Sequence, residues 1–131
     1  MAAPKIDKEL LITTKNEIGV LADVCTTLSK ARVNIEAMCA YGMGDKGSFM
    51  VYTYDQDKAK KALEDAGYKV DAEEIVVATL DNKVGAAELM TSKVAKSGVS
   101  VNYCYGSAGD GKYTLFIMNT DNNNKALKAI K

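Results

Sequence analysis

The chain has 131 residues, enough for one ordinary domain or two very small ones, and its 47% hydrophobic and 26% charged residues are typical of a soluble globular protein. Lysine plus arginine balances aspartate plus glutamate at 17 each, so the sequence lacks the basic excess of nucleic-acid binders, and we expect no nucleic-acid partner and no membrane association. The absence of histidine removes the commonest general base and the usual metal ligand, which argues against an enzyme.

The first half of the chain alternates strand and helix patterns. Runs of aliphatic, aromatic and β-branched residues predict strands, and apolar residues at helical spacing predict helices. In chain order, we expect a strand at 9–14, a helix around 21–28, strands at 33–37 and 49–54, a helix at 59–66 and an extended segment at 68–81. The predicted order is therefore β-α-β-β-α-β.

The second half of the chain repeats this order, which indicates an internal duplication. Adding 66 carries Gly19, in the first strand-to-helix turn, onto Gly85 in the second, and the same offset relates strands 49–51 and 115–117 without a gap. We divide the chain into domain 1 (residues 1–72) and domain 2 (residues 73–131). The second copy ends in its last helix, so its final strand is absent. Either the chain is truncated, or a neighbouring chain covers the open sheet edge.

A glycine-rich stretch at residues 40–49 contains G-x-G-x-x-G, the pattern of a dinucleotide-binding loop. That loop must follow a strand and open a helix, because the helix N-terminus holds the pyrophosphate. Here a strand follows, and the counterpart at 108–113 keeps a turn composition without the motif. We therefore interpret the stretch as a hairpin and expect no cofactor. RNA binding remains a lesser alternative, because Ser48 and Met50 stand where an RNA-recognition strand carries stacking aromatics.

The cysteines and the N-terminus favour a cytoplasmic protein. Cys25, Cys39 and Cys104 are odd in number and widely spaced, so they signal neither a disulfide framework nor a metal site. The N-terminal residues lack the apolar core of a signal peptide, and no apolar run approaches the length of a bilayer span. We expect reduced thiols and no bound metal.

Apolar residues occur on both faces of the predicted strands, including Tyr52 and Tyr54. In a β-α-β-β-α-β unit both helices cover one sheet face, and an exposed apolar face usually marks an interface. Single exposed tyrosines, however, need no explanation. We expect a homodimer.

The strand-to-helix turns carry the clearest binding signal. The first contains Asn16 and Gly19, and the second contains Asn82 and Gly85. Glycine beside a helix N-terminus lets the backbone approach a ligand, and free N–H groups there attract a carboxylate. An asparagine amide can donate to a carboxylate or accept from an ammonium group. The pattern suits a zwitterionic free amino acid, although asparagine and glycine can equally serve only to build the turn.

These features together resemble the ACT domain, a family of amino-acid-binding regulatory modules attached to enzymes such as phosphoglycerate dehydrogenase and aspartokinase. The resemblance rests on the turn at residues 16–21, the amphipathic helix, residues 33–35 and the glycine hairpin, with residues 82–85 and 99–101 as their counterparts. It covers nearly the whole chain, as in small stand-alone tandem ACT proteins. It implies an α+β, ferredoxin-like βαββαβ fold in two tandem repeats, the second without its last strand.

The resemblance also implies where an effector binds, namely where the strand-to-helix turn of one domain meets the second strand of its neighbour. The implied ligand-binding residues are Asn16, Glu17, Ile18, Gly19, Val20, Leu21, Asn34 and Ile35 in the first copy, and Asn82, Lys83, Val84, Gly85, Ala86, Ser100 and Val101 in the second. Ser100 replaces the asparagine at position 34, so the two half-sites need not bind equally. We expect a non-catalytic sensor of a free amino acid. The alternative is an interaction module that regulates a partner enzyme without a ligand of its own.

Overall fold

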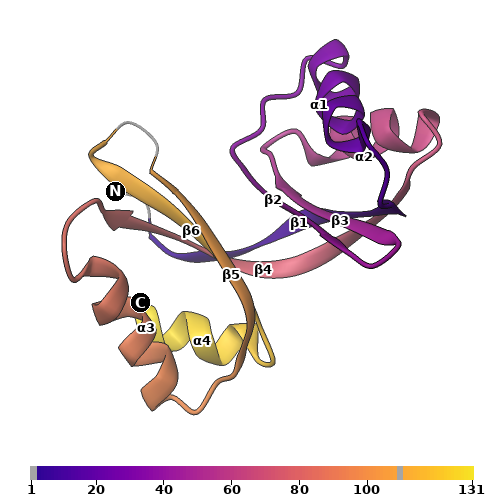
Figure 1. Cartoon of the computed structure of the whole chain (residues 1–131). Helices are drawn as coiled ribbons and strands as arrows, with labels where there is room; N and C mark the ends of the chain where they lie inside the picture. The colour runs from indigo at the N-terminus through magenta and orange to yellow at the C-terminus, as the bar shows by residue number, and fades with distance from the viewer. Residues whose placement is uncertain (1–2, 109–110) are drawn as a thin grey trace. The chain divides into compact units, whose positions relative to one another are not determined.

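The computed structural model describes residues 3–108 and 111–131 (Figure 1). In chain order the elements are β1 (Lys5–Lys15), α1 (Val20–Lys30), β2 (Ala37–Met43), β3 (Lys46–Tyr52), α2 (Gln56–Asp65), β4 (Lys69–Asp81), α3 (Ala86–Lys96), β5 (Val101–Ala108), β6 (Tyr113–Thr120) and α4 (Asn123–Ile130). The β-α-β-β-α order, its repetition and the antiparallel sheet confirm the predicted α+β fold.

The chain folds as two compact units. The first module is Lys8–Glu73, and the second combines the residues up to Asp7 with Glu74–Lys131. The predicted boundary between residues 72 and 73 therefore differs by one residue from the observed one, and the N-terminal segment was assigned to the other domain. Because β1 has 11 residues and β4 has 13, about twice the ordinary strand length, each strand contributes to both modules.

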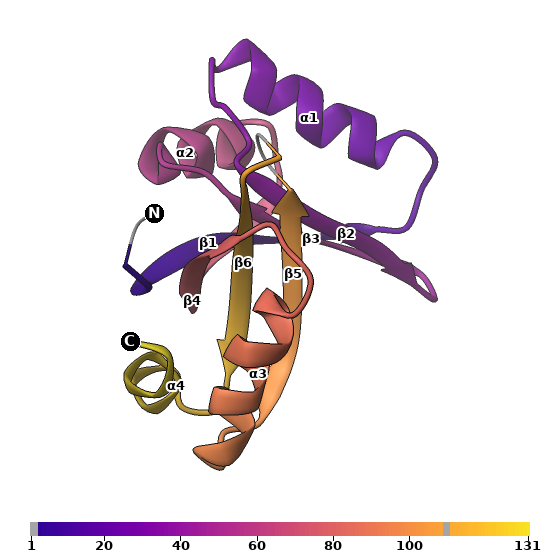
Figure 2. The ribbon, with the colours of Figure 1, turned by 90° about the vertical axis from the view of Figure 1, so that its left-hand side faces the viewer.

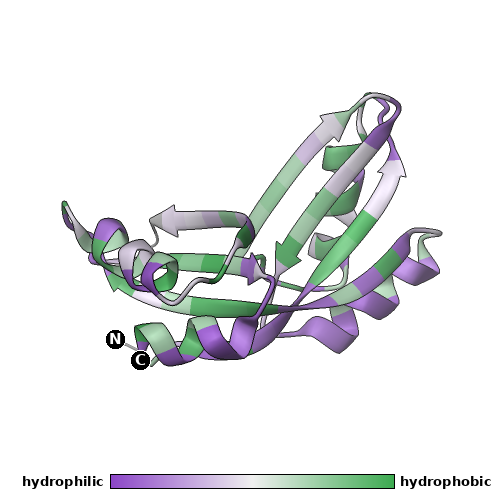
Figure 3. Ribbon diagram, turned by 90° about the horizontal axis from the view of Figure 1, so that it is seen from below, coloured by the Kyte–Doolittle hydropathy of each residue, from purple (hydrophilic) through white to green (hydrophobic). Residues whose placement is uncertain are grey.

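In the first module the strand order is β2-β3-β1-β4. Strands β1 and β3 pair antiparallel with Leu10 opposite Val51. Helices α1 and α2 bury Val24, Leu28 and Leu63 in one core with these strand residues. Figure 3 shows strands with hydrophobic stretches beside hydrophilic ones, and helices that are part hydrophobic and part hydrophilic. This amphipathic pattern is what packs the helices onto the sheet.

In the second module the strand order is β1-β4-β6-β5, and β4 takes the place that β1 has in the first module. Helices α3 and α4 contribute Met90, Val94 and Ala126 to its core (Figure 2). Ile6, at the start of β1, packs against the same core. The closing strand that the second repeat lacks after α4 is thus supplied by the beginning of the same chain. The sequence left truncation or a neighbouring chain as explanations for an open edge; in the structure β1 pairs with this edge of β4.

The offset between the copies changes in the second hairpin. Leu10 pairs with Val51, whereas its counterpart Val76 pairs with Met118, which lies 67 residues after Val51 rather than 66. Helix α4 likewise begins 67 residues after α2 (123 against 56). The gap-free alignment was therefore wrong by one residue beyond the hairpin. Residues 109 and 110, between β5 and β6 in the chain, lie outside the described residues.

The corrected offset places identical residues at equivalent positions. Its pairs are Phe49 with Phe116, Thr53 with Thr120 and Ala59 with Ala126. Thr53 accepts a hydrogen bond from the backbone N–H of Asp55 at 3.2 Å, and Thr120 accepts one from Asn122 at 3.2 Å. These identities at a spacing of 67 indicate the extra residue in the second hairpin. An alignment with one fixed offset of 66 does not detect them.

The second strand of the first copy begins later than predicted. Residues 33–36 form an irregular segment, and β2 begins only at Ala37. The helix-terminating turn explains the delay, because Arg32 adopts a left-handed φ of 59° and the N–H of Val33 donates back to Leu28 O at 3.0 Å. Strand β2 therefore extends into the glycine-rich stretch, and the turn of the hairpin is confined to residues 44–45.

The aromatic residues expected on the second sheet face differ in exposure. Met50 and Tyr52 are 3% and 0% exposed, whereas Tyr41 and Tyr54 are 47% and 71% exposed. The exposed apolar face from which a homodimer was predicted is therefore smaller than expected. In the described part of the chain, no helix has the length and apolar character needed to cross a membrane.

Candidate functional site

The first strand-to-helix turn is fastened to the β2–β3 hairpin through Asn16. Its backbone N–H donates to Asp45 O at 2.8 Å, and its side-chain Nδ2 donates to Gly44 O at 3.0 Å. A Cβ on Gly42 would lie only 2.6 Å from Asn16 Nδ2, so glycine at this position permits the close approach. The glycine-rich stretch is thus a hairpin, as predicted, and its carbonyl groups also hold the strand-to-helix turn by hydrogen bonds with Asn16.

The second turn repeats this arrangement. The backbone N–H of Asn82 donates to Lys112 O at 2.9 Å, and its Nδ2 donates to Gly111 O at 3.0 Å. In both copies Nδ2 thus gives one of its two N–H groups to a hairpin carbonyl, which leaves the second N–H for another acceptor. The side-chain oxygen of the asparagine can accept a hydrogen bond from an ammonium group.

Gly19 and Gly85 hold the same backbone conformation at the N-caps of α1 and α3, each with φ of 90°. No side chain caps either helix. An added Cβ would meet nothing within 4 Å at either glycine, so glycine is required here by the left-handed φ rather than by space.

Each helix then presents backbone N–H groups toward the turn. Among the described residues, the N–H groups of Leu21 and Ala22 have no hydrogen-bond partner, and neither do those of Ala87 and Glu88. Such unpaired donors at a helix N-terminus carry a partial positive charge and favour an anionic group such as a carboxylate. The two copies therefore share one donor arrangement behind a left-handed glycine.

A small hollow of about 180 Å³ adjoins the first turn. It brings together four predicted residues and three from β2 that the sequence did not single out: Asn16, Glu17, Val20 and Leu21 with Ala40, Tyr41 and Gly42. Its volume is below the roughly 300 Å³ at which ligand pockets usually begin. The hollow in the first module is therefore smaller than an ordinary ligand pocket.

A shallower hollow of about 500 Å³ adjoins the second turn. It contains four of the predicted residues and four others from α3: Lys83, Val84, Gly85 and Ala86 with Glu88, Leu89, Ser92 and Lys96. Sequence reasoning missed these α3 side chains, although their spacing along one helix face was visible once the helix was predicted.

The remaining predicted residues lie elsewhere in their modules. Asn34 and Ile35 line a separate hollow beside the C-terminal half of α1, and Asn34 Nδ2 donates to Glu36 Oε2 at 2.6 Å. In the second module the backbone N–H of Ser100 donates to Asp121 Oδ1 at 3.1 Å, and Val101 begins β5. Within one module the structure does not bring these residues together with the turn. Their meeting with the turn of a neighbouring domain stays a prediction.

The tip of each turn carries an exposed apolar side chain. Ile18 is 107% exposed and its counterpart Val84 is 103% exposed. These side chains stand beside the unpaired N–H groups, so each turn offers an apolar and a polar contact to whatever covers it.

The described residues offer little to a metal. No group of three or more Cys, Asp or Glu side chains among them is arranged to hold an ion. Cys25, Cys39 and Cys104 are free thiols, at separate places in the fold.

Comparison with known proteins identifies the fold. A family model described as an ACT domain pair matches residues 6–131. The crystal structure of protein BT0572 from Bacteroides thetaiotaomicron is 26% identical with a TM-score of 0.87, and the match covers 98% of this chain and 88% of that chain. No curated protein matches the chain.

Two structures of the regulatory subunit of aspartate kinase share the fold. The subunit from Thermus flavus is 15% identical with a TM-score of 0.65, over 98% of this chain and 95% of that chain. The ligand-free subunit from Thermus thermophilus is 16% identical with a TM-score of 0.67, over 98% of this chain and 97% of that chain. The family match spans both modules and includes β1, whose first residues close the second module. The chain belongs to the ACT domain pair family.

Proposed function

We propose that this chain is a non-catalytic regulatory protein that binds a free amino acid at its strand-to-helix turns. The observation that carries the proposal is the pair of unpaired N–H groups that follows a left-handed glycine in both modules. These donors would hold the ligand's carboxylate, and the side-chain oxygen of Asn16 or Asn82 would accept from its ammonium group. The likeness to regulatory subunits of aspartate kinase supports a regulatory role.

A second surface completes each site in this proposal. The hollow at the first turn is small, and Ile18 and Val84 are fully exposed beside the donors. A ligand held between a turn and a neighbouring domain, here in a homodimer, would bury these side chains. Binding then stabilises the joined state by its differential affinity for that state, which is the basis of a switch.

A thermal-shift panel of the twenty amino acids at millimolar concentration tests this proposal, followed by titration calorimetry and light scattering with the best ligand. We expect one or a few amino acids to raise the melting temperature and to change the mass in solution. Gly19→Val and Gly85→Val should abolish the effect, because a β-branched residue cannot hold φ near 90°. Gly67→Val is the matched control for backbone strain, since Gly67 has φ of 94° and open space but lines neither hollow at the turns.

A panel with no response would contradict the proposal and favour the alternative of an interaction module. In that case Ile18 and Val84 would mark the surface that contacts a partner enzyme. Replacing both by serine should then weaken binding to a co-purified enzyme without any effect of amino acids.

A further inference from the structure

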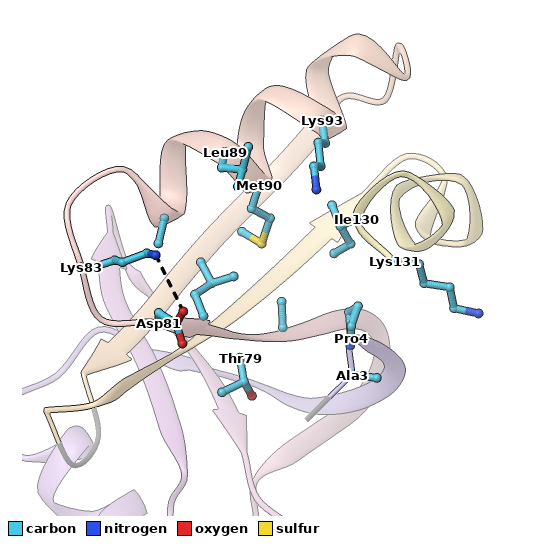
Figure 4. A pocket seen from close by; sticks show the side chains of 13 residues that line it. Ala3, Pro4, Thr79, Asp81, Lys83, Leu89, Met90, Lys93, Ile130 and Lys131 are labelled. Carbon is cyan, nitrogen blue, oxygen red and sulfur yellow. Dashed lines mark ion pairs between the residues drawn. The ribbon is translucent and has the colours of Figure 1, made fainter. Parts of the chain in front are cut away.

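The second module contains a cavity of about 520 Å³ between α3 and α4, over β4 (Figure 4). It is lined by residues 78–81 of β4, by Ala86, Leu89, Met90 and Lys93 of α3, by Ile130 and Lys131, and by Ala3 and Pro4, among other residues. Its volume falls in the range of roughly 300–1,000 Å³ typical of small-molecule sites. Most of the lining is apolar, so the cavity favours an apolar body.

The first module fills the corresponding position with an aromatic side chain of its own. Tyr68 immediately precedes β4, the strand that closes the first module, and packs against its core while its hydroxyl donates to Asp23 on α1. The counterpart of Asp23 on α3 is Leu89, which lines the cavity. The residue that immediately precedes the closing strand of the second module is Pro4, which also lines it. The second module thus lacks the ring that the first one supplies.

The cavity also differs from its counterpart in charge. Figure 4 shows Lys93 reaching from α3 toward the space between the helices. No ion pair involves Lys93 among the described residues, whereas Lys83, at the rim, lies 4.0 Å from Asp81. The residue of α1 that is equivalent to Lys93 is Thr27, whose hydroxyl donates a hydrogen bond to Asp23 O at 2.8 Å. A free ammonium group beside an apolar cavity favours an organic anion.

We propose that this cavity binds a small aromatic carboxylic acid. The ring lies among Leu89, Met90 and Ile130, in the position that Tyr68 occupies in the first module, and the carboxylate meets Lys93. Leu89 is 63% exposed in the unbound chain and becomes covered by the ligand. The cavity shares Lys83, Ala86 and Leu89 with the hollow at the second turn, but Lys93 and Ile130 line the cavity and not that hollow, so a change at Lys93 tests the cavity separately.

Three probes with one ring and different charges test the proposal by titration calorimetry and by two-dimensional NMR of the labelled chain. They are 3-(4-hydroxyphenyl)propionate, which is anionic, 4-ethylphenol, which is neutral, and tyramine, which is cationic. We expect the acid to bind about fivefold more tightly than the phenol, which is the scale of one exposed ion pair, and tyramine to bind most weakly. The shifted NMR signals should belong to α3, α4 and β4 of the second module.

Two variants separate the ring contact from the charge contact. Lys93→Met should make the acid and the phenol bind equally, while the exposed Lys128→Met on α4 should preserve the preference for the acid. Leu89→Trp should fill the cavity and abolish binding of all three probes, with folding checked by circular dichroism. An acid preference that persists in Lys93→Met, or signals that shift only outside this cavity, would overturn the proposal. The amino-acid response of Lys93→Met reports separately on the turn sites, so the two proposals fail independently.

Discussion

The two modules share their turns but differ at their closing edges. Asn16 and Asn82 make equivalent contacts with their hairpins, with Nδ2 to carbonyl distances of 3.0 Å in both copies. The first module is closed by the strand that follows its last helix, and Tyr68 anchors that edge to α1. The second is closed by the first residues of the chain and leaves a cavity at this edge. The duplication has therefore kept the backbone of the turns, while the edge of each module has diverged.

The largest expected effect distinguishes the closing edges. Deletion of residues 1–7 removes Ile6 and the strand that pairs with the second half of β4, but it leaves Lys8–Lys15 of β1 in the first module. We expect the second module to lose its cooperative fold, because an open sheet edge and a half-open core remain. Hydrogen exchange should show lost protection in α3, α4 and β6, with the strands of the first module still protected.

The matched control for this deletion is Lys5→Ala, which removes an exposed side chain and keeps the strand. A deletion variant with full protection in the second module would contradict the assignment of the N-terminal strand. Equal loss of protection in both modules would show that the two cannot fold separately.

The next prediction tests whether the two turns, which have the same geometry, contribute equally to stability. Asn16→Ala and Asn82→Ala each remove one side-chain hydrogen bond to a hairpin carbonyl. We expect each variant to lower the free energy of unfolding by about 1 kcal/mol, the usual net value of such a bond. Urea denaturation of the two variants measures the difference between them. If the two losses of unfolding free energy differed by much more than about 1 kcal/mol, the equivalent contacts would have different roles.

The smallest expected effect concerns the contact between Tyr68 and Asp23, which is present at the closing edge of the first module. Burial and the carboxylate of Asp23 raise the pKa of Tyr68 to about 12, so the folded state favours the protonated phenol. The stability from this contact is fully present below about pH 10, the ordinary pKa of tyrosine, and is lost as the pH rises through about 12. Tyr68→Phe should cost about 0.5 kcal/mol at neutral pH and should flatten the loss of stability between these values.

Urea midpoints at neutral and at alkaline pH check this prediction, with Tyr54→Phe as the control because Tyr54 is largely exposed. If the Tyr68→Phe variant loses as much stability at alkaline pH as the unmodified chain, the loss belongs to another titrating group. Such a result would also weaken the view that the phenol anchors this edge.

Local patterns allowed most of the fold to be predicted. The apolar spacing of Leu21, Val24 and Leu28 is typical of a helix. The glycine just before it predicts the turn, and neither prediction depends on distant residues. The strand at residues 33–37 was displaced, because a helix-terminating turn at Arg32 overrode its alternating pattern. The single offset of 66 failed at the hairpin, where an extra residue costs little and leaves no mark on periodicity.

The sequence alone determined the order of elements, the duplication and the two glycine turns, because each rests on neighbouring residues or on a repeat within the chain. Only the tertiary structure decided that the first strand closes the second module, that Asn16 is seated on the hairpin at Gly42, and that a cavity stands where the other module has Tyr68. Each of these joins segments far apart in the chain. Pairing of that kind depends on which edges and cores remain unsatisfied after the local elements have formed.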